Sequence, residues 1–434
     1  MNNLDRRSFL RAPVNEFDGC TFLGAVGFSM KNPTTEQRNI LILSFTLVVV
    51  MLGYGMVIPI IPFYVENMGA GGTELGMLVA SYALMRLVFG PIWGSLSDRI
   101  GRKPVLMIGV FGYAIAMFFF GLATQLWMLF AARVLSGILS SATAPTTMAY
   151  IGDSTPEEER GGGMGMMGAA VGLGTVLGPG LGGLLSGSSL ATPFFIAAGL
   201  SLLSVVLIYL LLPESLPAGE RRSSAEKLHG LRRRDLWQAL SGPIGILLIL
   251  VFMVTAGITT FYGIFGLYAL ERYNYGPKEV GVVMMVMGLV SAVAQGGLSG
   301  PFTRRFGDAA VIKSAMLVST LAYLFMLPAD TFITLLLATG FFFLITALLI
   351  PALTSLTSRL APMEQGITMG LSNSFMSLGR IVGPLWGGWA FDMNINLPFL
   401  SGAGILFVGF IVSLFGLARA PEKASGVGLQ SSIK

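Results

Sequence analysis

The chain has 434 residues, of which 54% are hydrophobic and 11% are charged, and its formal net charge is +5. Soluble domains are usually about 25% charged, so this composition excludes a soluble globular protein, and the apolar content excludes a disordered one. A polytopic helical membrane protein is the class that remains. A single cysteine, Cys20, and a single histidine, His229, exclude an intramolecular disulfide and any metal site or triad built on these residues.

Twelve apolar segments can be read along the chain, each near the roughly 20 residues that a transmembrane helix needs. They are predicted at 39–65, 75–97, 104–124, 126–150, 164–187, 192–213, 242–270, 280–300, 309–328, 331–352, 364–390 and 396–419. All are predicted to be helices, because backbone groups in lipid must satisfy their own hydrogen bonds. Strands of a membrane barrel would alternate in polarity over about ten residues, and the segments do not.

The segments form two groups of six, with a polar, basic linker between the groups and a polar tail at each end. The predicted units are 1–38, 39–213, 214–238, 239–419 and 420–434. Of the 27 Lys and Arg residues, 22 lie in the tails, the linker and the loops on the same side, whereas two lie on the opposite side. The positive-inside rule therefore predicts that both termini are cytoplasmic, in a plasma or bacterial inner membrane.

The two halves repeat each other at an offset of about 205 residues. GPGLGG at Gly178–Gly183 corresponds to GPLWGG at Gly383–Gly388, and GSLSDRIG at Gly94–Gly101 corresponds to GPFTRRFG at Gly300–Gly307. Parallel six-helix repeats of this kind occur in transporters that bind a substrate near the middle of the membrane, between the halves. The repeat therefore predicts a transporter beyond what hydrophobicity alone indicates.

The sequence between the second and third segments reads GSLSDRIGRKPVL. Gly94 is expected to allow close helix approach, and Gly101 a tight turn. Asp98 ends a helix where it can face either a nearby arginine or the positive N-terminus of another helix. The alternative is a plain hairpin held in the cytoplasm by its positive charges. The motif residues are Gly94, Asp98, Arg99, Gly101, Arg102 and Lys103.

This loop resembles the signature G-x-L-x-D-R-x-G-R-[KR] of the major facilitator superfamily at nearly every position. In the fourth segment LFAARVLSG, with Arg133 and Gly137, resembles the R-x-x-x-G motif of the same superfamily. In the fifth segment GAAVGLGTVLGPGLGG resembles the motif of the antiporter branch, with Gly178, Pro179 and Gly183 at its end. Its glycines are expected to form a groove for close helix packing, and Pro179 to kink the helix.

Two further stretches, LGYGMVIPIIP in the first segment and SYALMRLVFGPIWG in the second, resemble the twelve-helix drug/proton antiporters, including the tetracycline exporters. The resemblance implies an all-α fold of twelve transmembrane helices in two six-helix bundles. It also implies export of drug-like or amphipathic organic molecules by proton antiport and alternating access. The expected partners are a small-molecule substrate, protons and the lipid bilayer, with no nucleic acid, no metal, no cofactor and no enzymatic activity, in a monomer.

The resemblance further implies a charge network that locks the cytoplasmic side in one state of the transport cycle. Asp98, Arg102 and Asp153 would form it, next to the loop that carries Arg160. Ordinary helix capping by Asp153 is the alternative. The related exporters often have an acid in the first helix, and this chain has VVVML there. The proton-coupling candidates that remain are Glu66, Asp98 and Asp153.

Three arginines, Arg86, Arg133 and Arg380, lie within apolar segments that hold no matching acids. A charge there is costly and should face a wet cavity or a partner. One interpretation is a positive cavity for an anionic organic metabolite, and the other is hydrogen bonding to carbonyls of neighbouring helices. Further cavity candidates, each equally explained by an interhelical hydrogen bond, are Tyr54, Tyr82, Thr259, Tyr262, Gln295, Asn373 and Ser377.

Overall fold

The computed structural model of the protein describes residues 35–156, 160–187, 189–217, 219, 221, 242, 244–361 and 365–417, and every regular element within these ranges is a helix. The first half contains α1 (Thr35–Asn67), α2 (Gly72–Ile100), α3 (Arg102–Gly121), α4 (Leu126–Ser140), α5 (Thr143–Ser154), α6 (Arg160–Leu185) and α7 (Thr192–Leu211). The second half contains α9 (Gly245–Tyr273), α10 (Pro277–Val293), the π-helix η3 (Ala294–Leu298), α11 (Ser299–Phe306), α12 (Asp308–Leu324), α13 (Phe332–Thr346), α14 (Leu349–Arg359), α15 (Gln365–Met393) and α16 (Leu397–Gly416).

These helices make twelve membrane-crossing units, because α4 with α5, α10 with η3 and α11, and α13 with α14 each continue one crossing. Ten of the units are long and apolar enough to span a bilayer. The other two are α12, which has only 17 residues, and α15, which carries polar side chains along its length. The prediction of an all-α fold with twelve transmembrane helices is confirmed.

The fourth, eighth and tenth crossings, predicted as helices, are each built from more than one element. The chain breaks at Ser141–Ala142 between α4 and α5, and again at Ala347–Leu348 between α13 and α14, 206 residues later. The repeat therefore extends to the breaks themselves. The predicted units 1–38, 214–238 and 420–434 fall largely outside the described residues, as do Cys20 and His229, so the domain boundaries stay a prediction.

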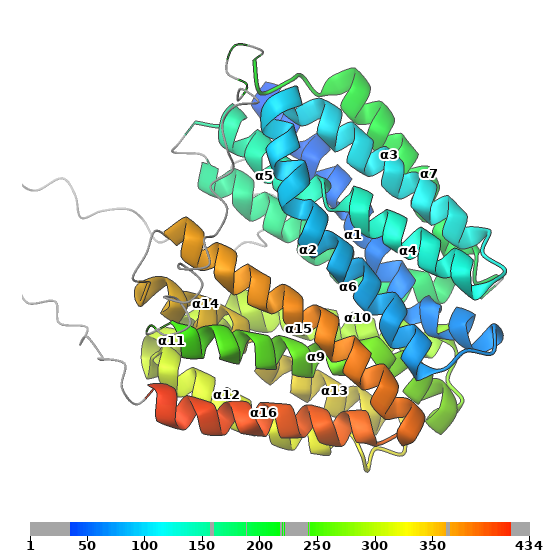
Figure 1. Ribbon diagram of the computed structural model, residues 1–434, viewed down its shortest axis with the longest axis vertical. Helices are drawn as coiled ribbons and strands as arrows, with labels where there is room; N and C mark the ends of the chain where they lie inside the picture. The colour runs from blue at the N-terminus through cyan, green and yellow to red at the C-terminus, as the bar shows by residue number, and fades with distance from the viewer. Residues whose placement is uncertain are drawn as a thin grey trace, which may run out of the picture.

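The helices form two bundles, one of α1–α7 and one of α9–α16 (Figure 1). In the first bundle α1 packs against α6 and α7, and α3 against α4 and α7. In the second bundle α9 packs against α15 and α16, and α12 against α16. Two helix pairs join the bundles: α2 with α15, and α6 with α10. These two pairs are equivalent under the internal repeat.

The bundles approach each other at one end only. We call the end where α1 begins and α16 ends the termini side, and the opposite end the far side. Figure 1 shows α2 and α15 close together on the far side, while the bundles spread apart toward the termini side. Two glycine-rich contacts close the far side. A Cβ on Gly76 of α2 would lie 3.3 Å from the Cα of Gly388 in α15, and a Cβ on Gly183 of α6 would lie 3.2 Å from the Cα of Gly281 in α10.

A carboxylate from the second bundle caps the N-terminus of α2 on the far side. Asp392, near the end of α15, accepts hydrogen bonds from the backbone N–H of Gly72 at 2.7 Å and of Thr73 at 2.8 Å. The hydroxyl of Thr73 donates to the same carboxylate. An anion at a helix N-terminus satisfies free N–H groups and interacts favourably with the helix dipole. This polar contact therefore adds to the glycine contacts that hold the far side closed.

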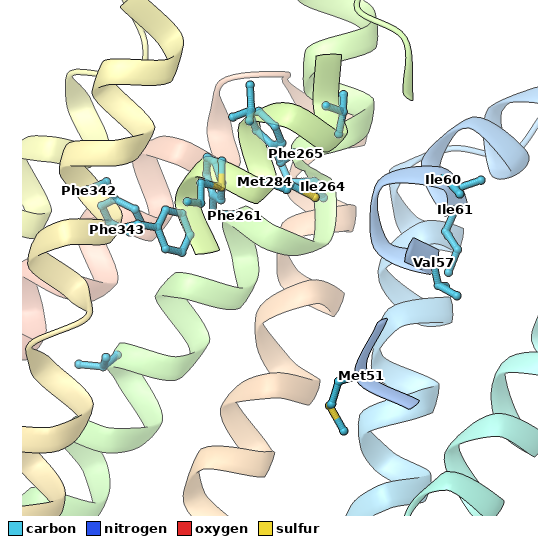
Figure 2. Packing of buried hydrophobic residues seen from close by; sticks show 14 of the residues in the cluster. Met51, Val57, Ile60, Ile61, Phe261, Ile264, Phe265, Met284, Phe342 and Phe343 are labelled. Atoms are coloured by element: carbon cyan, nitrogen blue, oxygen red, sulfur yellow. The ribbon is translucent and has the colours of Figure 1, made fainter. Parts of the chain in front are cut away.

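The apolar core runs through both bundles and meets between them. Met51, Val57, Ile60 and Ile61 of α1, Ile264 and Phe265 of α9 and Met284 of α10 all belong to one cluster of buried apolar residues, labelled in Figure 2. Phe261 of α9 anchors an aromatic group, with ring centroids 4.9 Å from Phe265 and 5.7 Å from Phe343. In lipid such contacts act through close packing, because the tails are as apolar as the side chains.

Replacing Asp392 with Asn should loosen the far side. The amide keeps the shape but loses the charge, which at a helix N-terminus contributes about 1 kcal/mol, so the ratio of closed to open far side should fall about fivefold. Nitroxide labels at Asn67→Cys and Met393→Cys, in a Cys20→Ser background, report the far-side distance by pulsed electron resonance. Asp330→Asn, another exposed far-side acid, is the matched control. An unchanged distance distribution in Asp392→Asn would contradict the assignment.

Candidate functional site

A charged network joins α2, α3 and α5 at the termini side. Arg102, the first residue of α3, donates from Nη1 to Asp98 Oδ1 at 2.5 Å and from Nε to Asp153 Oδ2 at 2.8 Å. Its Nη1 also donates to the hydroxyl of Ser97 at 2.7 Å. The Arg102 side chain is only 9% exposed. The structure thus brings together the three residues of the expected network, and Asp98 faces an arginine.

The sequence missed one member of this region, Glu214. Its carboxylate accepts from the backbone N–H of Arg102 at 2.8 Å and of Lys103 at 3.3 Å, so it caps α3. Gly101 makes the turn before α3 with φ +110°, a conformation that favours glycine. Lys103 donates to the carbonyl of Tyr209 at 2.9 Å. Glu214 is 112 residues from Arg102 in the chain, and no local pattern signals such a pairing.

Three other motif residues take no part in the network. Arg99 is exposed at the end of α2. Arg160 donates from Nε to the carbonyl of Thr155 at 3.2 Å. The expected close approach at Gly94 was wrong for this structure, because no atom lies within 4 Å of the place where its Cβ would be. The helices diverge at this level, which explains the empty space.

The second half contains one ion pair of this network with inverted charges. Residues 206 positions after Asp98, Arg102 and Asp153 are Arg304, Asp308 and Arg359. Arg359 Nη1 lies 3.4 Å from Asp308 Oδ2, and Ser355 donates to the same oxygen at 3.0 Å. Asp308 is buried with 3% of its side chain exposed, whereas Arg359 is 73% exposed. The repeat therefore preserves the ion pair while exchanging its signs.

A cluster of tyrosines and arginines lies in the middle of the first bundle. Tyr54 of α1 and Tyr82 of α2 stack with ring centroids 5.2 Å apart at 26°. The guanidinium of Arg133, from α4, lies over the Tyr82 ring at 4.5 Å and over the Tyr54 ring at 5.9 Å. Ser140 and Tyr82 share a hydrogen bond of 3.2 Å between their hydroxyls. Aromatic faces attract cations, so the rings stabilise the Arg133 charge in place of a carboxylate.

The R-x-x-x-G spacing of α4 positions this contact. Arg133 and Gly137 are four residues apart and therefore lie on one face of the helix. A Cβ on Gly137 would lie 3.0 Å from the carbonyl oxygen of Tyr82 and 2.8 Å from the Cβ of Met85. The glycine lets α4 approach α2 closely enough for Arg133 to reach the Tyr82 ring. Arg133 is 2% exposed, and its Nε has no hydrogen-bond partner.

Two further arginines point to the same region from different bundles. Arg86, one turn after Tyr82 on α2, lies 5.7 Å from the Tyr82 ring. Arg380 of α15 is exposed and lies within electrostatic range of Arg86, Tyr54 and Tyr82. Tyr262 of α9 lies within electrostatic range of Tyr54 and packs edge-on against Phe343 at 5.1 Å. We call Tyr54, Tyr82, Arg86, Arg133, Tyr262 and Arg380 the central cluster.

The central cluster carries positive charge without paired anions. The ion pairs recorded between described residues involve Arg102, Arg272 and Arg359, and none includes Arg86, Arg133 or Arg380. Arg133 makes ring contacts, and Arg380 donates to the sulfur of Met376 at 3.3 Å. Carbonyl contacts, the alternative that the sequence left open, are absent from the hydrogen bonds described for these three side chains.

The other cavity candidates are not joined to the cluster by any described contact. Thr259 donates to the carbonyls of Thr255 at 2.7 Å and Gly379 at 3.0 Å, so it joins α9 to α15. Ser377 donates to the carbonyl of Asn373 at 2.8 Å within α15. Asn373 and Ser377 are four residues apart on α15 and precede Arg380 toward the termini side. Gln295 is exposed within η3.

The glycine motif of α6 contacts both bundles. Gly178 lies against Gly55 of α1, and Gly180 and Gly183 lie against α10 of the other bundle. The expected groove is shorter than the motif, because no atom lies within 4 Å of a Cβ on Gly168 or Gly172. Helix α6 continues through Pro179 without a break. The motif therefore places the contact between α6 and α10, which joins the two bundles, directly beside α1.

The last candidate, Glu66, is exposed at the far-side end of α1. It lies near Glu271 of α9, which also lies within electrostatic range of Asp392. Glu66 is therefore remote from the network of Asp98 and Asp153 on the termini side, and the proton-coupling candidates do not form one site.

Two repeated bundles, a closed far side and a polar cluster halfway across the membrane define a multi-pass membrane transporter for small molecules. Comparisons with known proteins support this class. The family model described as Major Facilitator Superfamily matches residues 43–346 and 247–431 of this chain. Multidrug resistance protein 2 of Bacillus subtilis (strain 168) is 32% identical over 398 residues, which cover 91% of this chain and 100% of the relative. The chain therefore belongs to the major facilitator superfamily, as the motifs predicted, and it is a transporter and not an enzyme.

Two further proteins extend the comparison. Quinolone resistance protein NorA of Staphylococcus aureus (strain COL) is 28% identical over 379 residues, which cover 87% of this chain and 96% of the relative. A crystal structure of a bacterial homolog to the human lysosomal transporter Spinster, in an inward-facing and occupied conformation, superposes with a TM-score of 0.72. That structure is 16% identical and covers 87% of this chain and 96% of its own, so it supports the fold alone.

Replacing Arg102 with Gln should destabilise the protein more than Arg99→Gln. Loss of Arg102 leaves two carboxylates facing each other, and we expect a cost of about 2 kcal/mol for this partly buried network. Arg99 is exposed at the end of α2, so its loss should cost at most about 1 kcal/mol. Thermal unfolding of both variants in detergent measures the difference. Equal destabilisation would show that burial of Arg102 does not set its contribution.

Replacing Gly137 with Ala should displace α4 from Tyr82. The added methyl overlaps Met85 and the Tyr82 carbonyl, and overpacking of this kind costs about 1–3 kcal/mol. Gly94→Ala is the matched control, because its methyl meets open space and should stabilise α2 by about 0.5–1 kcal/mol. The two melting temperatures should shift in opposite directions, and a shift in the same direction would refute the packing assignment.

Proposed function

We propose that this chain exports drug-like or amphipathic organic molecules in exchange for protons, by alternating access. The observation that carries the proposal is the central cluster, placed midway along the helices between two bundles that meet only on the far side. A site in this position becomes reachable from either side when the bundles rock. The relatives named as multidrug and quinolone resistance proteins support drug-like molecules as the substrate class.

The termini side faces the cytoplasm in this proposal. The loops and tails on that side carry 22 of the 27 Lys and Arg residues, which the positive-inside rule assigns to the cytoplasm. The structure then corresponds to an inward-facing state of a plasma or bacterial inner membrane protein, acting as a monomer. A substrate enters from the cytoplasm, the termini side closes, and the far side opens to release it.

The network of Asp98, Arg102 and Asp153 would act as the cytoplasmic gate. In the inward-facing state the two carboxylates hold Arg102. Rocking of the bundles brings α15 toward the end of α2, where Asp98 can exchange its contact with Arg102 for the positive N-terminus of α15. Protonation of Asp98 or Asp153 removes a negative charge that holds Arg102. It therefore weakens the network, as the movement of Asp98 away from Arg102 does. Glu66, on the far side, is the remaining coupling candidate.

A second candidate function is supported by the charge of the central cluster. Arg86 and Arg380 have no carboxylate partner among the described residues and are accessible, so the same fold would suit a carrier for an anionic organic metabolite. The two candidate functions differ only in the molecule that is transported. Both would use the same fold and the same proposed gate.

Inside-out vesicles with an acid interior and a pH-sensitive dye test the proposal. Tetracycline, a cationic dye and an organic anion are added outside in turn, and the molecule that the protein transports inward should release protons. Asp98→Asn should slow this release about tenfold, because loss of one charge-assisted hydrogen bond of the gate corresponds to at least ~1.4 kcal/mol. Arg305→Gln, an exposed charge change outside this network, is the control. Wild-type rates in Asp98→Asn would refute the gating role, and transport of every substrate without proton release would refute antiport.

A further inference from the structure

The central cluster holds like charges on both bundles, and the three arginines differ in accessibility. Arg133 is buried and covered by the rings of Tyr54 and Tyr82. Arg86 is half-buried, and Arg380 is exposed. A ligand can therefore reach Arg86 and Arg380 directly, whereas Arg133 acts through the ring that it holds. Arg133 is therefore a positioning residue, whereas Arg86 and Arg380 are the residues that a ligand could contact.

The position of Arg86 and Arg380 follows from the contact between α2 and α15. Gly76 of α2 lies against the backbone of Pro384 in α15. At 1.5 Å per residue, Arg86 lies about 15 Å and Arg380 about 6 Å from this contact, and both lie toward the termini side. Arg380, Pro384 and Gly388 are spaced four apart, so Arg380 lies on the stripe of α15 that faces α2. The two arginines therefore face the space where the bundles begin to diverge.

Two cations across this space repel each other. Arg86 and Arg380 carry like charges on helices that pack against each other, and no carboxylate among the described residues pairs with either one to offset them. Repulsion between the bundles opposes any motion that brings α2 and α15 closer on the termini side. In a partly dehydrated environment this repulsion is stronger than it would be in water. The empty site therefore resists closure of the termini side.

We propose that the transported molecule is an aromatic organic anion whose charged group binds between Arg86 and Arg380 while its ring packs on Tyr54, the partly exposed ring of the stacked pair, so that binding removes the repulsion and lets the termini side close. The inference rests on the proposed transport function and deepens it by naming the substrate class and the coupling step. The substrate acts as the missing anion of the cluster. An empty transporter stays open, and a loaded one closes.

The chemistry of the residues specifies the ligand. Guanidinium groups form paired, charge-assisted hydrogen bonds with planar oxyanions, so a carboxylate or sulfonate fits between two of them. Stacked tyrosine rings offer an aromatic surface, and ring pairs prefer offset or edge-on geometry. Arg133, which lies over Tyr82, keeps that ring in place without contacting the ligand. A cation would meet three like charges, and the site discriminates against it.

Binding to the purified full-length protein in lipid nanodiscs tests the substrate class. Radiolabelled 2-naphthoate, with empty nanodiscs subtracting membrane partition, is displaced by unlabelled 2-naphthoate, by the neutral 2-naphthamide or by the cationic 2-naphthylmethylammonium. These probes share one ring system and differ in charge. We expect 2-naphthoate to bind about 10- to 100-fold more tightly than 2-naphthamide, and the cation not to compete. Tighter binding of the amide or the cation would overturn the proposal.

Variants assign the effect to the two arginines. Arg86→Gln and Arg380→Gln should each weaken 2-naphthoate binding about 10-fold or more while leaving 2-naphthamide binding unchanged. Arg305→Gln removes an exposed charge outside the central cluster and should bind both probes as the wild type does. Arg380→Glu should bind the cationic probe and lose the anion, which shows that a variant with altered binding is still folded. Wild-type anion binding in both glutamine variants would overturn the proposal.

The coupling step has its own measurement. Nitroxides at Ile100→Cys and Phe306→Cys, two exposed and repeat-related positions on the termini side, report its opening in a Cys20→Ser background. We expect 2-naphthoate, but not 2-naphthamide, to shift the distance distribution toward shorter values. Arg380→Gln should shift it without ligand, because the repulsion is gone. No shift in either case would overturn the coupling. These experiments use no proton gradient, so a failed antiport assay would refute only the proposed function.

Discussion

The structure depends on how an arginine is stabilised inside a membrane without an acid beside it. Arg133 lies in the apolar interior of the first bundle, and its charge rests on the rings of Tyr82 and Tyr54. This arrangement needs α4 close to α2, which requires Gly137, and it needs α1 beside α2 so that Tyr54 can stack on Tyr82. The packing of three helices therefore follows from one charge. The same requirement fixes Tyr82, which lies next to Arg86.

The sequence predicted the crossings well, because apolar runs and polar loops directly reflect the bilayer. It could not predict the breaks at Ser141–Ala142 and Ala347–Leu348, since both lie inside apolar segments whose composition does not change. It identified the arginines by their cost in lipid, but not the rings that stabilise Arg133. Those contacts join residues from different helices, and hydrophobic patterns contain no information about which helices are neighbours.

Polar contacts between distant parts of the chain escaped prediction for the same reason. Asp392 is 320 residues from Gly72, and Glu214 is 112 residues from Arg102. Each looks like an ordinary acid near a helix end when only its neighbours in sequence are considered. The internal repeat was visible in motifs, yet its exchange of charge signs emerged only when Asp308 and Arg359 were seen in contact. Equivalent backbone positions thus carry opposite charges in the two halves.

The glycine contacts that close the far side have a mechanical consequence. Where Gly76 meets Gly388 and Gly183 meets Gly281, backbone lies against backbone with no side chain between. Rocking about such a joint requires no side chain to change its rotamer and no interlocking ridges to separate. At these two positions the bundles can tilt against each other without unlocking side chains, whereas the Met285 side chain, which lies against Gly180, resists tilting elsewhere in the contact between α6 and α10.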